Sequence, residues 1–182
     1  MFKTKQDLLA YVMEEKHEFT KHRQVNGVDF VLTYRPTDLL VAQEIQIGQE
    51  QNQIEKLRDK YSRYMYFNLS MSYKNREVLT AALRDRSKYQ HVLKNLAFNM
   101  RDKIKIYNEE GETFPVADCI FPRMYDLDGK NTLLLVVKRD EQLLKNNSFK
   151  ITLKDIGLYT GEVTFKVPSK AILQQPSLSF EL

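Results

Sequence analysis

The chain has 182 residues, of which 42% are hydrophobic and 29% charged, a composition that is ordinary for a soluble globular protein with a substantial core. Its longest apolar run, Leu133 to Val137, is too short for a membrane-spanning helix, and its one cysteine, Cys119, excludes an intramolecular disulfide and a multi-cysteine metal site. The net charge of +4 is uneven, because residues 55–105 carry 13 basic and 5 acidic side chains, whereas the segment on each side has a net charge of −2.

A short helix and a β-hairpin are predicted near the N-terminal end. Residues 4–16 have helical spacing, with Thr4 at the capping position and an apolar face formed by Leu8, Leu9, Val12 and Met13. The pair Asn26-Gly27 then separates two strand-like runs, residues 19–25 and 28–34. A two-residue type I′ turn requires positive φ at both central positions, which Asn and Gly tolerate best, so a tight hairpin is expected.

Two helical insertions are predicted at about residues 37–62 and 75–96. Thr37 is expected to cap the first, which fits either one long helix or two helices separated near Gly48. Ser87 is expected to cap a helix inside the second. Between them, residues 64–73 alternate strictly, so one face of this strand is apolar and the other carries Tyr64, Tyr66, Asn68, Ser70 and Ser72.

Residues 98–167 are predicted to be rich in β-strand. Strands are expected at 98–107, 114–121, 132–138, 149–153 and 162–167, with one helical turn at 140–145 and an extended tail at 168–182 that adds an edge strand at 177–181. Regular alternation of strands and helices is missing, which argues against a doubly wound parallel sheet. The predicted fold class is α+β: a single domain over residues 1–182, mainly an antiparallel β-sandwich-like domain with helical insertions.

The sequence contains few signs of catalysis. It has no nucleophile elbow, phosphate-binding loop or dinucleotide fingerprint, and its three histidines lack metal-ligand spacing. The run Asp126 to Gly129 begins like a calcium loop, but Leu135 stands where an EF-hand needs glutamate. Cys119 is interpreted as a buried, inert thiol. We therefore expect no catalytic residue, metal or cofactor; an enzyme whose acidic site is assembled only by folding is the third alternative.

Two surfaces are candidates for binding. The first is the polar face with Tyr64, Tyr66 and Asn68, which suits a protein or glycan partner unless a helix covers it. The second is the basic segment, which suits nucleic acid, acidic lipid or an acidic protein unless its charges form a solvated helix face. Its candidate residues are Arg58, Arg63, Arg84, Arg86 and Lys88.

The order of several short segments resembles uncharacterised bacterial envelope lipoproteins. They are Thr-Lys-Gln-Asp-Leu-Leu at 4–9, Val-Asn-Gly-Val at 25–28, Tyr-Arg-Pro-Thr-Asp-Leu-Leu at 34–40 and the run from Leu153 to Phe165. The resemblance implies a non-enzymatic binding or assembly module of the periplasm or outer membrane, serving a secretion or surface apparatus through protein partners. Because no signal peptide or lipidated cysteine is present, it also implies a trimmed ectodomain whose N-terminal lipid anchor is missing.

The alternative comes from the charge distribution. The basic segment 55–105 also fits a cytoplasmic nucleic-acid-binding protein, a class in which cationic side chains lie among aromatic ones.

Overall fold

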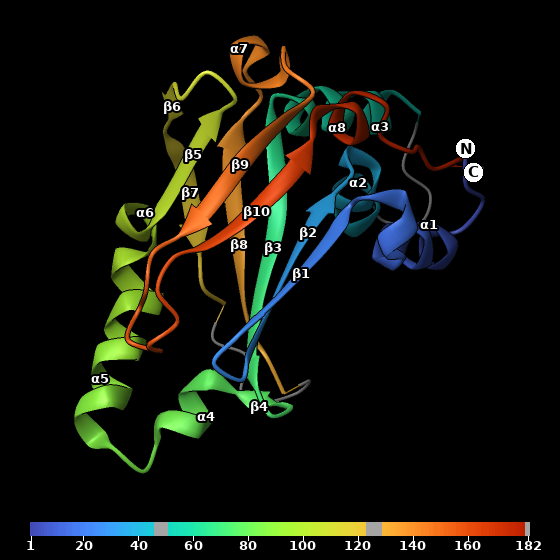
Figure 1. Cartoon of the computed structure of the whole chain (residues 1–182). Coiled ribbons are helices and arrows are strands. Elements are labelled where there is room, and N and C mark those ends of the chain that lie inside the picture. Colours follow the sequence, from blue (N-terminus) through green and yellow to red (C-terminus); the bar gives the residue numbers. More distant parts are fainter. Residues whose placement is uncertain (46–50, 123–128, 181–182) are drawn as a thin grey trace.

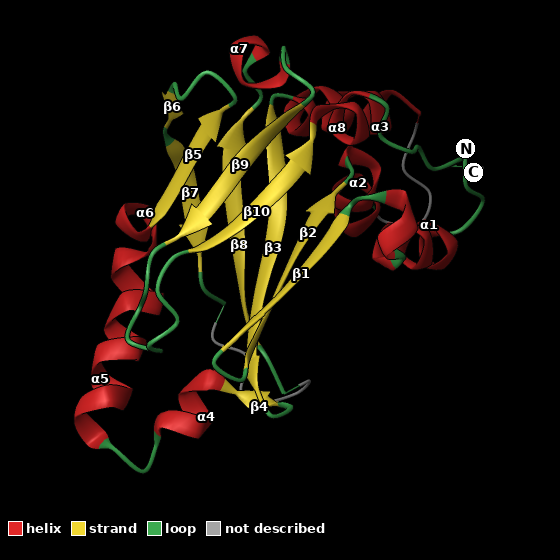
Figure 2. Cartoon of the chain, viewed as in Figure 1, coloured by secondary structure: helices red, strands yellow, loops and turns green. Residues whose placement is uncertain are grey.

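The computed structural model describes residues 1–45, 51–122 and 129–180, and its strands form two antiparallel sheets with helices around them (Figures 1 and 2). The first sheet has the order β1-β2-β3-β8-β7, with β4 also paired to β3, and the second has the order β10-β9-β5-β6. The predicted α+β class is therefore confirmed. The strands of the first sheet are β1 (Thr20–Val25), β2 (Val28–Arg35), β3 (Tyr64–Tyr73), β4 (Arg76–Glu77), β7 (Val116–Ile120) and β8 (Asn131–Lys138). Those of the second are β5 (Ile104–Asn108), β6 (Thr113–Phe114), β9 (Ser148–Leu153) and β10 (Val163–Pro168).

The main hydrophobic core lies between the two sheets. Phe67 of β3 meets Phe149 of β9 edge to face, with 6.4 Å between the ring centroids. Alternate residues of β3 point into this core, as the sequence predicted, and all are almost fully buried: Met65, Phe67, Leu69 and Met71. Each such side chain contributes roughly 1.5–3 kcal/mol by leaving water. The opposite face of β3 is thereby turned outward, away from the second sheet.

The N-terminal predictions are largely confirmed. The hairpin of β1 and β2 closes through Asn26 and Gly27, whose φ angles of 51° and 77° are those of a type I′ turn. Helix α1 (Lys5–Met13) begins at Thr4, whose hydroxyl oxygen accepts a hydrogen bond from the Asp7 N–H at 3.1 Å. The helix ends three residues earlier than predicted, and a separate 3₁₀ turn, η1 (Glu15–His17), follows it.

The first helical insertion contains two helices, α2 (Thr37–Glu44) and α3 (Gln51–Ser62), and Gly48 lies outside the described residues. The prediction that Thr37 caps the first helix is wrong, because Pro36 occupies the cap position and Thr37 is already helical. The Thr37 N–H instead donates to the side-chain oxygen of Gln175 at 2.9 Å. The acceptor at the start of this helix is therefore the distant side chain of Gln175 and not the hydroxyl of Thr37.

The second insertion is longer than predicted. It contains α4 (Val78–Ala82), α5 (Arg86–Lys94), a π-helical turn η2 (Asn95–Asn99) and α6 (Met100–Lys103). Asp85 rather than Ser87 caps α5: its carboxylate accepts from the Lys88 N–H at 3.0 Å and carries the charge that a helix N-terminus favours. The strand expected at 98–107 is confirmed only from Ile104 onward, as β5, because the helical path continues to Lys103 and leaves Phe98 82% exposed.

In the C-terminal half, the strands predicted at 132–138, 149–153 and 162–167 are confirmed as β8, β9 and β10, one helical turn is confirmed, and two predictions are corrected. The helical turn is α7 (Glu141–Leu144). The single strand predicted at 114–121 is divided at Pro115, with β6 in the second sheet and β7 in the first. The predicted extended tail begins instead with helix α8 (Ser169–Leu173), and within residues 174–180 its edge strand is reduced to one bridge between Leu178 and Phe2.

Candidate functional site

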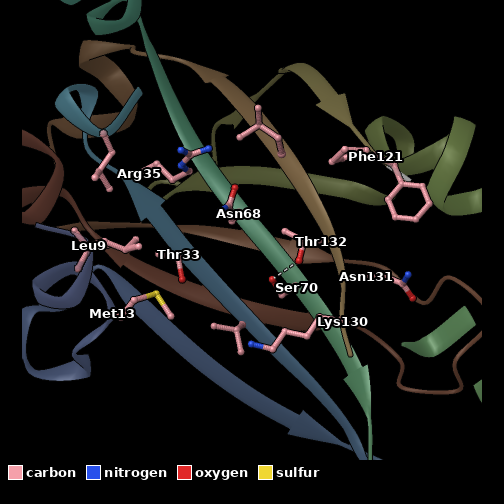
Figure 3. A pocket seen from close by; sticks show the side chains of 15 residues that line it. Leu9, Met13, Thr33, Arg35, Asn68, Ser70, Phe121, Lys130, Asn131 and Thr132 are labelled. Carbon is pink, nitrogen blue, oxygen red and sulfur yellow. Dashed lines mark hydrogen bonds between the residues drawn. The ribbon is translucent and has the colours of Figure 1, made fainter. Parts of the chain in front are cut away.

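The outer face of the six-stranded sheet is hollowed into a groove of about 550 Å³ (Figure 3). Leu9 and Met13 of α1 form one wall. Phe121 and Pro122, which follow β7, form the other. The floor comes from β2, β3 and β8. We call this hollow the outer groove; its size lies within the roughly 300–1,000 Å³ range of ligand sites in proteins.

The pleat of the sheet explains the composition of the floor. In β2 the residues Phe30, Leu32 and Tyr34 point into the core, so Val31, Thr33 and Arg35 point outward. The register places Thr33 beside Asn68 and Asn68 beside Leu134, which aligns their side chains across three strands. Along the next row, the hydroxyls of Ser70 and Thr132 lie 2.8 Å apart. The floor therefore combines hydroxyl and amide groups with a few aliphatic side chains.

The charge of the outer groove is positive. Arg35 and Lys130 line it, and no carboxylate occurs among its described lining residues. Arg35 is half-buried at the end of β2 and makes no hydrogen bond or ion pair with any residue that the structure describes. Burial lowers the pKa of the Arg35 guanidinium, although a guanidinium stays protonated in proteins. The groove thus contains a positive charge that the described part of the protein does not neutralise.

The predicted aromatic surface is divided by helix α3. Tyr66 meets Tyr61 of α3 edge to face, with 5.7 Å between centroids, and is half-buried, and its pKa is raised by that burial. Tyr64 lies 6.4 Å from Tyr66 and is 38% exposed. Asn68 lies farther along β3, on the floor of the outer groove. Helix α3 thus covers Tyr66, whereas Asn68 lines an open hollow.

The predicted basic residues do not form one patch. Arg58 makes two hydrogen bonds of 2.8 Å to the Asp38 carboxylate, and Arg63 pairs with Asp59 at 2.6 Å. Arg84 and Arg86 are exposed around the start of α5, at the other end of the molecule from α3 (Figure 1). Lys88 lies nearby, with its amine 5.0 Å from the centroid of the Tyr159 ring.

The one cysteine, Cys119, lies on strand β7. Burial raises the pKa of the Cys119 thiol to about 11, the Asp118 charge adds to this effect and Arg101 opposes it, so the thiol stays protonated near neutral pH. Over the ranges that the structure describes, no three His, Cys, Asp or Glu side chains are placed to hold a metal ion. The predicted calcium-loop aspartates lie outside those ranges.

In the part of the chain that the structure describes, none of the helices has the length and apolar character needed to cross a bilayer.

Several residues of the outer groove were not singled out from sequence. Leu9 and Met13 were assigned to the apolar face of the first helix, but each is 47% exposed on the groove wall. In the sequence, Arg35 was noted only as part of the run at 34–40. Because Arg35 follows the inward-facing Tyr34 along β2, strand alternation could have predicted that its side chain points outward. Nothing in the local sequence predicted that Lys130 lies in the groove.

No protein-family model matches this sequence, and no curated protein matches it. Among solved structures, the chain is similar to a crystal structure described as a novel protein of unknown function from Burkholderia pseudomallei. The two share 9% sequence identity with a TM-score of 0.47, and the match covers 93% of this chain and 86% of that one. A similarity of this size assigns no family and indicates no activity.

Proposed function

We propose that the protein is a non-enzymatic binding module and that the outer groove is the place where a protein partner docks. The observation that supports this proposal is the groove itself, a hollow of about 550 Å³ on a sheet face that the rest of the described chain leaves open. Rigid strands supply its floor, which favours recognition because little ordering of the site is needed on binding.

The chemistry of the groove suits a polypeptide. Leu9 and Met13 on one wall and Phe121 on the other offer apolar surface. Asn68 and the paired hydroxyls of Ser70 and Thr132 lie between the walls. Apolar contacts around a few fixed polar groups are typical of sites that take their specificity from hydrogen bonds. None of these groups is required to break or form a covalent bond in the function that we propose.

Site-specific photo-crosslinking tests this proposal in cells that make the protein naturally. A photo-reactive residue in place of Asn68 should form a discrete adduct with a partner, and Ser70→Trp, which fills the floor, should abolish it. The control carries the same reactive residue in place of Lys150, which is exposed on the second sheet. Equal labelling from both positions, or labelling from position 68 that Ser70→Trp leaves unchanged, would contradict docking in the groove.

We further propose that the module works in the bacterial cell envelope, held by an N-terminal lipid anchor as part of a secretion or surface apparatus. This proposal is supported by the resemblance of residues 4–9, 25–28, 34–40 and 153–165 to envelope lipoproteins. Fractionation of cells expressing the native gene, with radioactive palmitate as a lipidation probe, should place the labelled product in the envelope. A cytoplasmic product that binds nucleic acid at low salt would support the alternative function instead.

A further inference from the structure

The inference concerns the chemistry of the partner and starts from Arg35. Three arginines of the described chain are half-buried: Arg35, Arg58 and Arg139. Arg58 is paired with the Asp38 carboxylate, and Arg139 donates to the Ile172 carbonyl at 2.9 Å. Arg35 has neither kind of partner among the described residues, although part of its hydration is lost by burial. A partly desolvated cation is stabilised when an anion reaches it, so Arg35 marks the position of a negative group on the ligand.

The second cation of the groove indicates that the ligand is elongated. The register pairs Arg35 with Tyr66, and Asn131, the neighbour of Lys130, with Met71. These two pairings lie five residues apart along β3, which corresponds to about 17 Å at about 3.3 Å per residue. Figure 3 shows Arg35 and Lys130 on either side of Asn68 and Ser70. A ligand that reaches both cations is therefore elongated along β3.

The polar floor distinguishes a peptide from a hydrocarbon chain. A fatty acyl chain of that length would cover the amide of Asn68 without offering it a hydrogen bond, and burying such a group unpaired is costly. The backbone of an extended peptide carries an N–H donor and a C=O acceptor at each residue. It can therefore pair with the side-chain amide of Asn68, which both donates and accepts hydrogen bonds. Its apolar side chains also find Leu9 and Phe121 on opposite walls.

We propose that the outer groove binds an extended segment of a partner protein that carries an aspartate or glutamate between apolar residues, with the carboxylate held by Arg35. The inference rests on the proposed function and adds the chemical class of the partner. A carboxylate is planar, and a guanidinium donates to it through two parallel N–H groups. Lys130 contributes a second, less directional positive charge near the other end of the groove.

Titration of the isotope-labelled full chain with short peptides tests this inference by NMR. The probe is a capped seven-residue peptide with a central glutamate between leucines and serines, and its matched partner has glutamine in place of the glutamate. The glutamate peptide should shift amide signals of β2, β3 and β8 and bind about 10-fold or more tightly than the glutamine peptide. Arg35→Gln should reduce this ratio to less than about 2-fold, and Arg35→Lys should give an intermediate value.

Controls separate this inference from the proposed function. Arg63→Gln removes an exposed arginine outside the groove lining and should leave the 10-fold ratio unchanged. Equal binding of the two peptides to the unmodified protein overturns the carboxylate inference and needs no variant to fold. Saturable binding of decanoate in place of the peptides overturns the choice of a peptide. If no peptide binds while the crosslink from position 68 persists, the inference alone fails; if both are absent, the proposed function fails as well.

Discussion

Asp155 shows how one carboxylate organises a whole loop. Its Oδ1 accepts hydrogen bonds from the N–H groups of Gly157 and Leu158 at 2.8 Å and of Tyr159 at 3.2 Å, and its Oδ2 accepts one from Gly161 at 3.2 Å. Burial alone would raise the pKa of this group. The four backbone donors outweigh burial and hold the pKa of Asp155 below its ordinary value of 3.8.

The sign of this shift predicts how stability depends on pH. Because the folded pKa lies below the unfolded one, the charged Asp155 stabilises the protein above the ordinary pKa, and this contribution is lost as the pH falls through the folded pKa. Asp155→Ala should lower the free energy of unfolding by about 1–2 kcal/mol at pH 7 and by less below about pH 4, measured by urea unfolding. Asp59→Ala, which breaks an exposed ion pair, should cost at most about 1 kcal/mol. A cost for Asp155→Ala that does not vary with pH would contradict this account.

At the scale of an element, the same loop between β9 and β10 contains two glycines with different constraints. Gly157 and Gly161 have φ angles of 103° and 65°, so both lie in the region that favours glycine. A Cβ on Gly157 would stand 2.5 Å from Cδ2 of His91, whereas a Cβ on Gly161 would meet nothing within 4 Å. Gly157 thus allows helix α5 to approach the loop. Gly161 is needed only for the positive φ angle of the backbone at that position.

Matched substitutions measure this difference. Gly161→Ala should cost about 1 kcal/mol, because only the backbone is strained. Gly157→Ala should cost about 2–4 kcal/mol, because His91 and α5 must also move. Thermal unfolding of the two variants under identical conditions provides the comparison. An equal loss of stability in the two variants would show that the His91 side chain moves aside at no cost and that its close approach to Gly157 contributes little to stability.

For the whole molecule, the C-terminal segment joins parts that are distant in sequence. The side-chain oxygen of Gln175 accepts from the Tyr34 hydroxyl and the Thr37 N–H, both at 2.9 Å. Burial raises the pKa of Tyr34 to about 12, opposed by Arg139, so its hydroxyl remains a donor. Three residues later, the Leu178 N–H donates to Asp38 at 2.7 Å and the Leu178 carbonyl accepts from Arg58 at 3.0 Å.

Removing this acceptor should loosen the N-terminal helices. Gln175→Ala leaves the Tyr34 hydroxyl and the Thr37 N–H without their partner, and we expect a loss of about 2–4 kcal/mol. Hydrogen exchange should become faster in α2 before it does so in β3. The exposed neighbour Gln174 supplies the control, since Gln174→Ala should change stability by less than about 0.5 kcal/mol. Unchanged exchange in α2 would mean that water replaces the glutamine without cost.

These contacts explain which features were predictable from sequence. The type I′ turn at Asn26-Gly27 depends only on the φ angles of those two residues, and the inward face of β3 depends only on the period of a strand. Both were predicted correctly. The cap of α2 comes from Gln175, and the helical path through Phe98 depends on how Leu96 and Met100 pack, so local patterns pointed elsewhere.

The outer groove was only partly predictable for the same reason. The polar face that carries Asn68 follows from alternation along one strand. Whether that face is open depends on where α1 and α3 pack, which no short segment encodes. The absence of a described partner for Arg35 likewise emerges only after every neighbouring side chain has been placed.

The link between Gln175 and Thr37 also constrains how the chain matures during synthesis. When the ribosome has just made Glu44, all residues of α2 exist, but the side chain that accepts its first amide proton will be translated 138 residues after Thr37. Helix α2 therefore reaches its final state only after the segment that contains Gln175 has been made. In products of translation that stops before Gln175, the Thr37 N–H lacks this acceptor, and quality-control proteases recognise incompletely folded segments of that kind.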